Sequence, residues 1–164
     1  MAGLQRAATD DRRLTQRLTF PGAHGDVLAG RLDRPDEAIR AYAVFAHCFT
    51  CGKDIRAAST ISRTLAREGI GVLRFDFTGL GSSEGDFANT TFSSNVGDLV
   101  AAARHLEAEH GPARLLIGHS LAEPRSSPPQ GKLPAIRAVA TIGAPIDAGH
   151  VRRLLARRPG EDHT

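Results

Sequence analysis

The sequence lacks a long apolar run, and its first residues lack the pattern of an export leader. Nowhere in its 164 residues does a segment approach the roughly 18 apolar residues that a membrane helix needs. Residues Met1 to Arg17 are polar and of mixed charge, without the apolar core of a signal peptide. We therefore expect a cytoplasmic protein with no membrane partner, and the length suffices for one domain with a sizeable core.

Charge of one sign is not concentrated in a way that indicates a nucleic-acid site. Lys and Arg total 21 against 18 Asp and Glu, and the basic residues are scattered except at Arg152-Arg153 and Arg157-Arg158. Nucleic-acid binding requires basic residues gathered on one face or along a groove. A solvated helix face explains the two Arg pairs, so we expect no nucleic-acid partner.

Cysteine is scarce, and its two positions provide no metal site. Both cysteines lie in the CxxC pattern formed by Cys48 and Cys51. Without a second Cys pair or a nearby His-rich cluster, no tetrahedral zinc site is expected. Two interpretations remain: thiol redox chemistry at Cys48 and Cys51, or two small side chains in a tight loop, which we favour.

A glycine-rich loop over residues 76–85 lacks the spacing of a dinucleotide site. Its glycines do not follow GxGxxG, and residues 86–90 are predicted to be irregular where such a site needs a helix. We therefore expect no cofactor.

Segments typical of strands alternate with segments typical of helices, which predicts the α/β class with a mostly parallel sheet covered on both faces. Residues 17–20 and 27–32 flank a Gly- and Asp-containing turn and are expected to form an antiparallel hairpin. Further apolar runs typical of strands are 41–46, 71–75, 115–117 and 135–142. We expect this domain to span residues 17–164, after a polar tail over residues 1–16.

Two helices are predicted between these strands. Residues 57–68 carry Ile61 and Leu65 at helical spacing and stop at Gly69, which suits a C-terminal cap. A longer amphipathic helix, whose function is packing, is expected over residues 92–106. A further helix is expected to begin near residue 151.

The most informative motif is a serine at the end of a predicted strand. Gly118-His119-Ser120-Leu121-Ala122 follows the apolar run 115–117, where a sharp turn would expose a nucleophile. Such a turn normally leads into a helix, but the next residues include Pro124, Pro128 and Pro129, which disfavour one. The motif predicts a hydrolase, and the segment after it conflicts with that prediction.

Four motifs in order resemble the α/β-hydrolase superfamily: Phe45–Asp54, Asp76–Ser83, Gly118–Leu121 and Ala140–Pro145. Within it, the chain looks most like the hydrolase half of bifunctional hydrolase/OsmC proteins, from about residue 18 to about residue 155. The resemblance implies an α/β-hydrolase fold and attack by a serine on the carbonyl of a small ester or acyl substrate.

The resemblance also implies roles for individual residues. Ser120 matches the nucleophile, and the backbone N–H groups of Leu121 and Phe49 would form the oxyanion hole. His47 and His119 match framework positions. They are poor candidates for the base, because the family's catalytic histidine comes late in the chain, beyond the last strand.

The chain departs from the family pattern after residue 142, where the last strands, the histidine loop and the OsmC half are expected but not found. Asp147 and His150 could serve as substitute acid and base, although a turn and a helix start explain them better. An edge strand without its neighbours also predicts self-association through the open sheet edge.

A second departure is the proline-rich segment 121–131, where the similar proteins have Leu-Gly-Gly and an alanine-rich helix. Deleting one G from a GC-rich coding sequence for Leu-Gly-Gly-Ala-Ala-Val-Leu-Ala-Ala-Ala yields residues 121–131 as they stand. We hypothesise a local reading-frame slip, compensated near Gly131. Ala122 also replaces the glycine usual at the turn.

Three hypotheses follow. The first is a serine hydrolase acting on a small ester or acyl substrate, impaired or inactive in this chain. The second is a non-catalytic remnant that pairs with a partner, and the third is redox chemistry at the CxxC.

Overall fold

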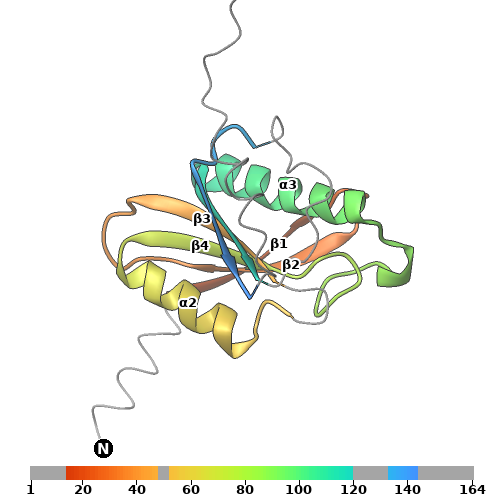
Figure 1. Cartoon of the computed structure of the whole chain (residues 1–164), viewed down its shortest axis with the longest axis horizontal. Helices are drawn as coiled ribbons and strands as arrows, with labels where there is room; N and C mark the ends of the chain where they lie inside the picture. Colours follow the sequence, from red (N-terminus) through yellow and green to blue (C-terminus); the bar gives the residue numbers. More distant parts are fainter. Residues whose placement is uncertain (1–13, 48–51, 120–132, 144–164) are drawn as a thin grey trace, which may run out of the picture.

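The computed structural model describes residues 14–47, 52–119 and 133–143. These residues form a six-stranded sheet of order β1-β2-β4-β3-β5-β6 (Figure 1). The strands are β1 (Thr15–Pro21), β2 (Val27–Asp33), β3 (Ala41–Ala46), β4 (Ile70–Phe75), β5 (Ala113–His119) and β6 (Ala138–Ile142). The sequence-based expectation of a mostly parallel α/β sheet is confirmed.

The sheet combines an antiparallel edge with a parallel remainder. β1 pairs with β2, and β2 with β4, in antiparallel fashion. The pairs β3–β4, β3–β5 and β5–β6 are parallel. The predicted hairpin is thus confirmed, and it begins at Thr15, two residues before the expected domain boundary.

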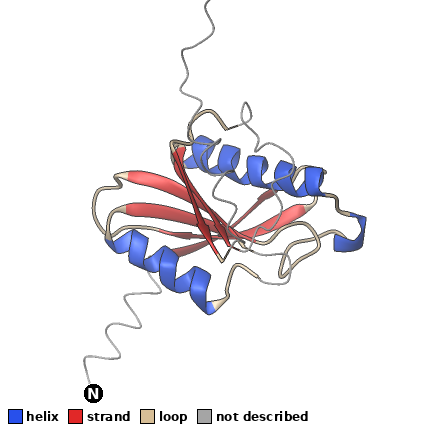
Figure 2. Ribbon diagram, viewed as in Figure 1, coloured by secondary structure: helices blue, strands red, loops and turns tan. Residues whose placement is uncertain are grey.

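Helices cover both faces of the sheet (Figure 2). The helix α2 (Arg56–Arg67) lies on one face and α3 (Phe92–Glu109) on the other. A single turn of 3-10 helix, η1 (Phe87–Asn89), precedes α3 within the stretch expected to be irregular. Gly69 follows α2 with φ of +87°, as the predicted cap requires.

Alternation along β3 divides the core into two layers. Val44 and Ala46 pack in the cluster that includes Leu106 of α3, whereas Ala43 and Phe45 pack in the cluster that includes Ala58 of α2. Because successive side chains of a strand point to opposite faces, one strand supplies both layers. The apolar runs read from the sequence therefore belong to strands buried on both sides.

The last predicted strand is shorter than expected. The run 135–142 becomes a strand only from Ala138, because residues before it form a turn in which the Ile136 N–H donates to the Leu133 carbonyl (3.2 Å). Pro134 lies within this turn and has no N–H to donate to a ladder. The helix expected near residue 151 lies outside the described residues.

Within the described part of the chain, no helix is long and apolar enough to span a membrane.

Candidate active site

The site is defined by the carboxyl ends of the parallel strands, which all meet at one edge of the sheet. Ala46 at the end of β3 lies beside Gly118 of β5, and Gly118 lies beside Thr141 of β6. β5 ends at His119, so the next residue in the chain, Ser120, follows the strand directly. Loops after β3 and β4 begin at the same edge.

The residues predicted to carry chemistry lie outside the described residues. This holds for Ser120, Leu121 and Phe49 of the proposed hydrolase site, for Cys48 and Cys51, and for Asp147 and His150. The structure describes the residues that directly precede or follow several of them.

The two histidines assigned to the framework are both described. His47 directly follows β3 and is fully buried, with its ring edge-on against Phe77 at a centroid distance of 5.5 Å. His119 is half-buried at the end of β5, and within the described chain its buried Nδ1 has no hydrogen-bond partner. A fully buried His47 does not present its imidazole to a substrate.

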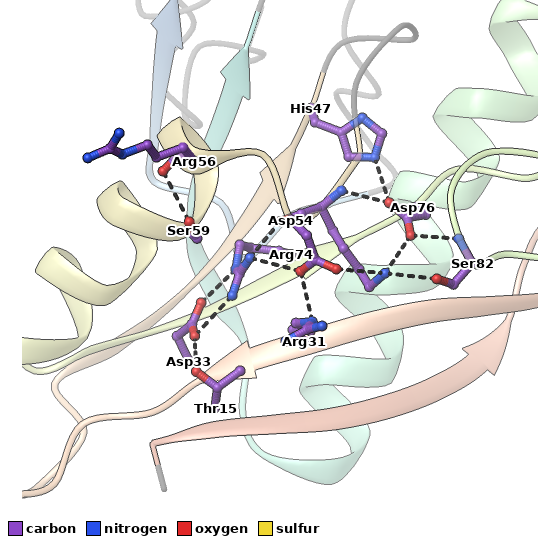
Figure 3. A network of polar contacts seen from close by, with 11 residues as sticks. Thr15, Arg31, Asp33, His47, Asp54, Arg56, Ser59, Arg74, Asp76 and Ser82 are labelled. Atoms are coloured by element: carbon purple, nitrogen blue, oxygen red, sulfur yellow. Dashed lines mark hydrogen bonds and ion pairs between the residues drawn. The ribbon is translucent and has the colours of Figure 1, made fainter. Parts of the chain in front are cut away.

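Asp76, the first residue after β4, is the centre of the described site (Figure 3). Its side chain is 1% exposed. Oδ1 accepts from the backbone N–H of Lys53 (2.7 Å) and lies 3.3 Å from His47 Nε2. Oδ2 accepts from Lys53 Nζ (2.6 Å) and from the backbone N–H of Ser82 (3.1 Å).

These contacts hold Asp76 in its charged form. Burial alone would raise the pKa of Asp76 from its ordinary value of 3.8, because a buried carboxylate loses hydration. Hydrogen bonds from His47, from both the ammonium and backbone N–H of Lys53, and from the Ser82 N–H outweigh that effect and lower the pKa well below the ordinary range. Asp76 is thus an anion at neutral pH and a poor proton acceptor.

The charge of Asp76 belongs to a larger ionic network of three cations and three carboxylates. Lys53 Nζ lies 3.4 Å from Asp54 Oδ2, which links Asp76 to the rest. Arg74 donates from Nε to Asp33 Oδ2 (2.7 Å) and from Nη1 to the Lys53 carbonyl (2.5 Å). Arg31 completes the network through Asp54 Oδ1 (2.8 Å). Because charges of opposite sign alternate, the buried groups are mutually neutralised.

Glycine permits the close approach of the loop after β4 to this carboxylate. Gly81 has φ of +53°, and a Cβ at this position would overlap the Asp76 carboxyl group. The neighbouring Ser83 Oγ donates to the Asp76 carbonyl (2.6 Å). The glycine-rich loop is therefore shaped around a carboxylate of its own chain.

A second buried carboxylate, Asp98 of α3, holds the other side of the same loop. Asp98 Oδ2 accepts from the N–H (2.9 Å) and hydroxyl (2.7 Å) of Thr78, and Oδ1 accepts from the Ala23 N–H (3.0 Å). Like Asp76 it is 1% exposed. These hydrogen bonds of Asp98 come from Thr78 and Ala23, whereas the described residues of the loop after β3 bond to Asp76.

Sequence reasoning treated Asp76 only as the start of a glycine-rich loop and missed its role. The available signal was an acidic residue directly after a buried strand, a position at which an unpaired carboxylate would be costly. Its partners His47 and Lys53 come from a different loop, so their identity required the fold. In the described residues, no cluster of three or more His, Cys, Asp or Glu side chains could hold a metal ion.

Residues 43–161 match the model of the alpha/beta hydrolase family. The chain belongs to this family. The match runs from within β3 to beyond β6 and includes Asp76, its partners His47, Lys53 and Ser82, and the Ser120 motif. No curated protein sequence matches the chain.

Solved structures similar to this α/β hydrolase include esterases. The esterase domain of a Rhodothermus marinus protein is 47% identical, with a TM-score of 0.61, covering 84% of this chain and 53% of that one. A lidless α/β serine hydrolase from Xanthomonas campestris is 27% identical, with a TM-score of 0.55, covering 65% and 50%.

A third structure supports the fold alone. Est1E from Butyrivibrio proteoclasticus, solved with ferulic acid bound, is 23% identical, with a TM-score of 0.56, covering 63% of this chain and 43% of that one. The α/β hydrolase chain thus spans about half the length of the structures it matches.

Proposed function

We propose that this α/β hydrolase is a serine hydrolase that acts on a small ester or acyl substrate through Ser120. The observation that carries the proposal is the end of β5 at His119, between β3 and β6, at the carboxyl edge of the sheet. Ser120 follows in the chain, in the sequence context of a nucleophile elbow. The 47% identity to an esterase domain supports an ester as substrate.

In the proposed reaction, Ser120 Oγ attacks the substrate carbonyl and the oxyanion accepts hydrogen bonds from the N–H groups of Leu121 and Phe49. Attack requires a base that takes the hydroxyl proton. Asp147 and His150 are the candidates for the acid and base within this sequence. Asp76 is excluded from that role by its burial and its lowered pKa.

Hydrolysis of p-nitrophenyl acetate tests the proposal. We expect turnover by the wild-type chain and none above background for Ser120→Ala. Ser126→Ala is the matched control, because it removes a serine from the segment directly after the motif. Equal turnover by wild type and Ser120→Ala would refute the proposal. The redox alternative instead predicts a dithiol-dependent activity that Cys48→Ser abolishes and Ser120→Ala leaves intact.

We further propose that the segment after Ser120 impairs this activity. Each proline within a helix costs about 3 kcal/mol, and a helix beginning after the nucleophile would stabilise the oxyanion through its dipole. Replacing residues 122–130 by Gly-Gly-Ala-Ala-Val-Leu-Ala-Ala-Ala is expected to raise the turnover. An unchanged or lower rate in a folded variant would contradict the proposed impairment.

The origin of this segment is proposed to be a local reading-frame slip. Reading the gene in the neighbouring frame over codons 121–131 tests it, because the slip predicts an alanine-rich frame there. A frame without that alanine-rich sequence would rule the slip out.

Kinship with the hydrolase half of hydrolase/OsmC proteins is likewise a proposal. It is supported by the 47% identity to a structure that is itself one domain of a Rhodothermus marinus protein.

A second candidate function is pairing with another chain through β6. Four of the five residues of β6 are exposed, and β6 is the outermost strand of the described sheet. An unpaired edge strand offers N–H and C=O groups to a second chain. We favour a second copy of this protein as the occupant, and an oligomer-state measurement tests it below.

A further inference from the structure

The Asp76 carboxylate connects two loops that lie at the proposed active-site edge. One is the loop after β3, which supplies His47 and Lys53, and the other is the loop after β4, which supplies Ser82. Asp76 itself is 1% exposed and does not reach a substrate. Any effect of Asp76 on the reaction therefore acts through the residues that it holds.

The two partners from the first loop stand on either side of Phe49 in the sequence. His47 precedes it by two residues and lies 3.3 Å from Asp76 Oδ1. Lys53 follows it by four residues and donates both its backbone N–H and its ammonium to the same carboxylate. A single side chain thus fixes the chain on both sides of the proposed oxyanion-hole residue.

The carboxylate is required because all of its partners are hydrogen-bond donors. Oδ2 faces two N–H groups, from Lys53 and Ser82, and Oδ1 faces the Lys53 N–H and the His47 ring. An asparagine in either orientation would direct its NH2 group at donors, leaving them without an acceptor. The isosteric change would therefore break the connection between the loops without changing the shape of the side chain.

We propose that Asp76 is a positioning residue for the reaction at Ser120: it holds the residues on both sides of Phe49 and the loop after β4 in one arrangement. The inference rests on the proposed function, since Phe49 matters only if it supplies an oxyanion donor. Misplacing such a donor costs about a hundredfold in kcat. Within the loop after β3, Lys53 makes the ionic contact with Asp76 through its ammonium group.

Hydrogen exchange by mass spectrometry on Asp76→Asn tests the positioning without needing activity. The matched control is Asp98→Asn, because Asp98 is equally buried and accepts three hydrogen bonds, which come from Ala23 and Thr78 rather than from His47 or Lys53. We expect Asp76→Asn to raise exchange at the amides of Lys53 and Ser82 about tenfold. The Asp98→Asn variant is expected to raise exchange at Ala23 and Thr78 and to leave Lys53 unchanged.

The kinetic consequence is measured on the same two variants with p-nitrophenyl acetate. Asp76→Asn is expected to lower kcat about a hundredfold with little change in KM, whereas Asp98→Asn, which leaves His47 and Lys53 in place beside Asp76, is expected to lower kcat far less. If Asp76→Asn does not fold, Lys53→Met replaces it, and this variant is expected to lower kcat by a smaller factor. Lys53→Met removes the ammonium and retains the backbone donor.

The outcomes separate this inference from the proposed function. Unchanged exchange at Lys53 in Asp76→Asn, or an equal rise in Asp98→Asn, overturns the positioning role. A raised exchange with unchanged kcat also overturns it, while Ser120 remains the nucleophile. Wild-type turnover that survives Ser120→Ala overturns the proposed function instead, and the exchange experiment still decides whether Asp76 holds both loops.

Discussion

At the scale of single residues, a buried carboxylate connects two loops at the proposed active-site edge, and its partners are distant in sequence. Ser120 was proposed from local sequence, because a serine after an apolar run within Gly-x-Ser forms a contiguous pattern. Asp76 was not, because its ammonium partner Lys53 is 23 residues away and reaches it only when β3 and β4 lie side by side. Contacts between loops of different strands follow from topology, which no local pattern contains.

The lowered pKa of Asp76 predicts a particular acid dependence of stability. In the unfolded chain the group titrates near 3.8, and in the folded chain well below that value. The contribution of the Asp76 charge to the stability of the fold is therefore fully present above pH 3.8 and is lost as the pH falls toward the folded pKa.

Asp76→Asn removes this titration and, by leaving buried donors unpaired, should lower the unfolding free energy at pH 7 by about 3 kcal/mol. Below pH 3.8 the difference in unfolding free energy between wild type and variant should narrow by about 1.4 kcal/mol per pH unit. Urea unfolding from pH 7 to pH 2.5 measures both curves. Curves that stay parallel below pH 3.8 would show that Asp76 is not held as an anion.

Gly81 predicts a cost of close approach that can be separated from backbone strain. In Gly81→Ala, a left-handed φ is combined with an overlap between the new Cβ and the Asp76 carboxylate. In Gly25→Ala, φ is also positive, at +91°, but the new Cβ has no atom within 4 Å. We expect the Gly25→Ala variant to lose about 1 kcal/mol and the Gly81→Ala variant at least twice that. Thermal unfolding compares them, and equal losses would contradict the packing of the loop around Asp76.

At the scale of elements, helix boundaries followed from local chemistry more closely than the last strand did. The predicted start of α3 at residue 92 is confirmed, and a capping box explains it: Thr91 Oγ1 accepts from the Ser94 N–H (3.1 Å), and Ser94 Oγ accepts from the Thr91 N–H (2.8 Å).

The predicted start of the last strand at residue 135 was wrong, because apolar residues alone do not distinguish a strand from the turn before it. The strand β6 begins at Ala138.

Thr91→Ala is expected to destabilise the protein by about 1 kcal/mol, because an orphan N–H of α3 loses its acceptor. Thr64→Ala is the control, since Thr64 is exposed within α2 and alanine suits a helix interior. We expect its effect to stay within about 0.5 kcal/mol. Chemical denaturation of both variants decides, and equal midpoints would show that the capping box contributes nothing.

At the scale of the whole molecule, the sheet has a hairpin at one edge and β6 at the other. The fold class followed from the sequence because buried parallel strands leave contiguous apolar runs separated by helical periodicity. The proposed catalytic residues are single residues rather than periodic runs, and they come from distant parts of the sequence, so their mutual positions depend on the assembled sheet. Among the described residues no strand pairs with the outer edge of β6, and this edge is the feature that predicts association.

Val139→Lys tests association through β6, because a lysine on an edge strand discourages pairing with a second chain. Val27→Lys is the control, because Val27 is 41% exposed against 40% for Val139. Unlike the outer edge of β6, the Val27 backbone is already hydrogen-bonded, to Glu84 in the loop after β4. Sedimentation velocity should show oligomers for wild type and Val27→Lys, and a smaller species for Val139→Lys. A monomeric wild type, or the same species in all three, would rule out this interface.

Labelling of the purified chain with a fluorophosphonate, with the modified peptide identified by mass spectrometry, tests most directly whether Ser120 is an activated nucleophile. The account predicts labelling at Ser120 that is lost in Ser120→Ala and retained in Ser126→Ala. A folded wild-type chain that takes up no label, or a label that persists in Ser120→Ala, would contradict it.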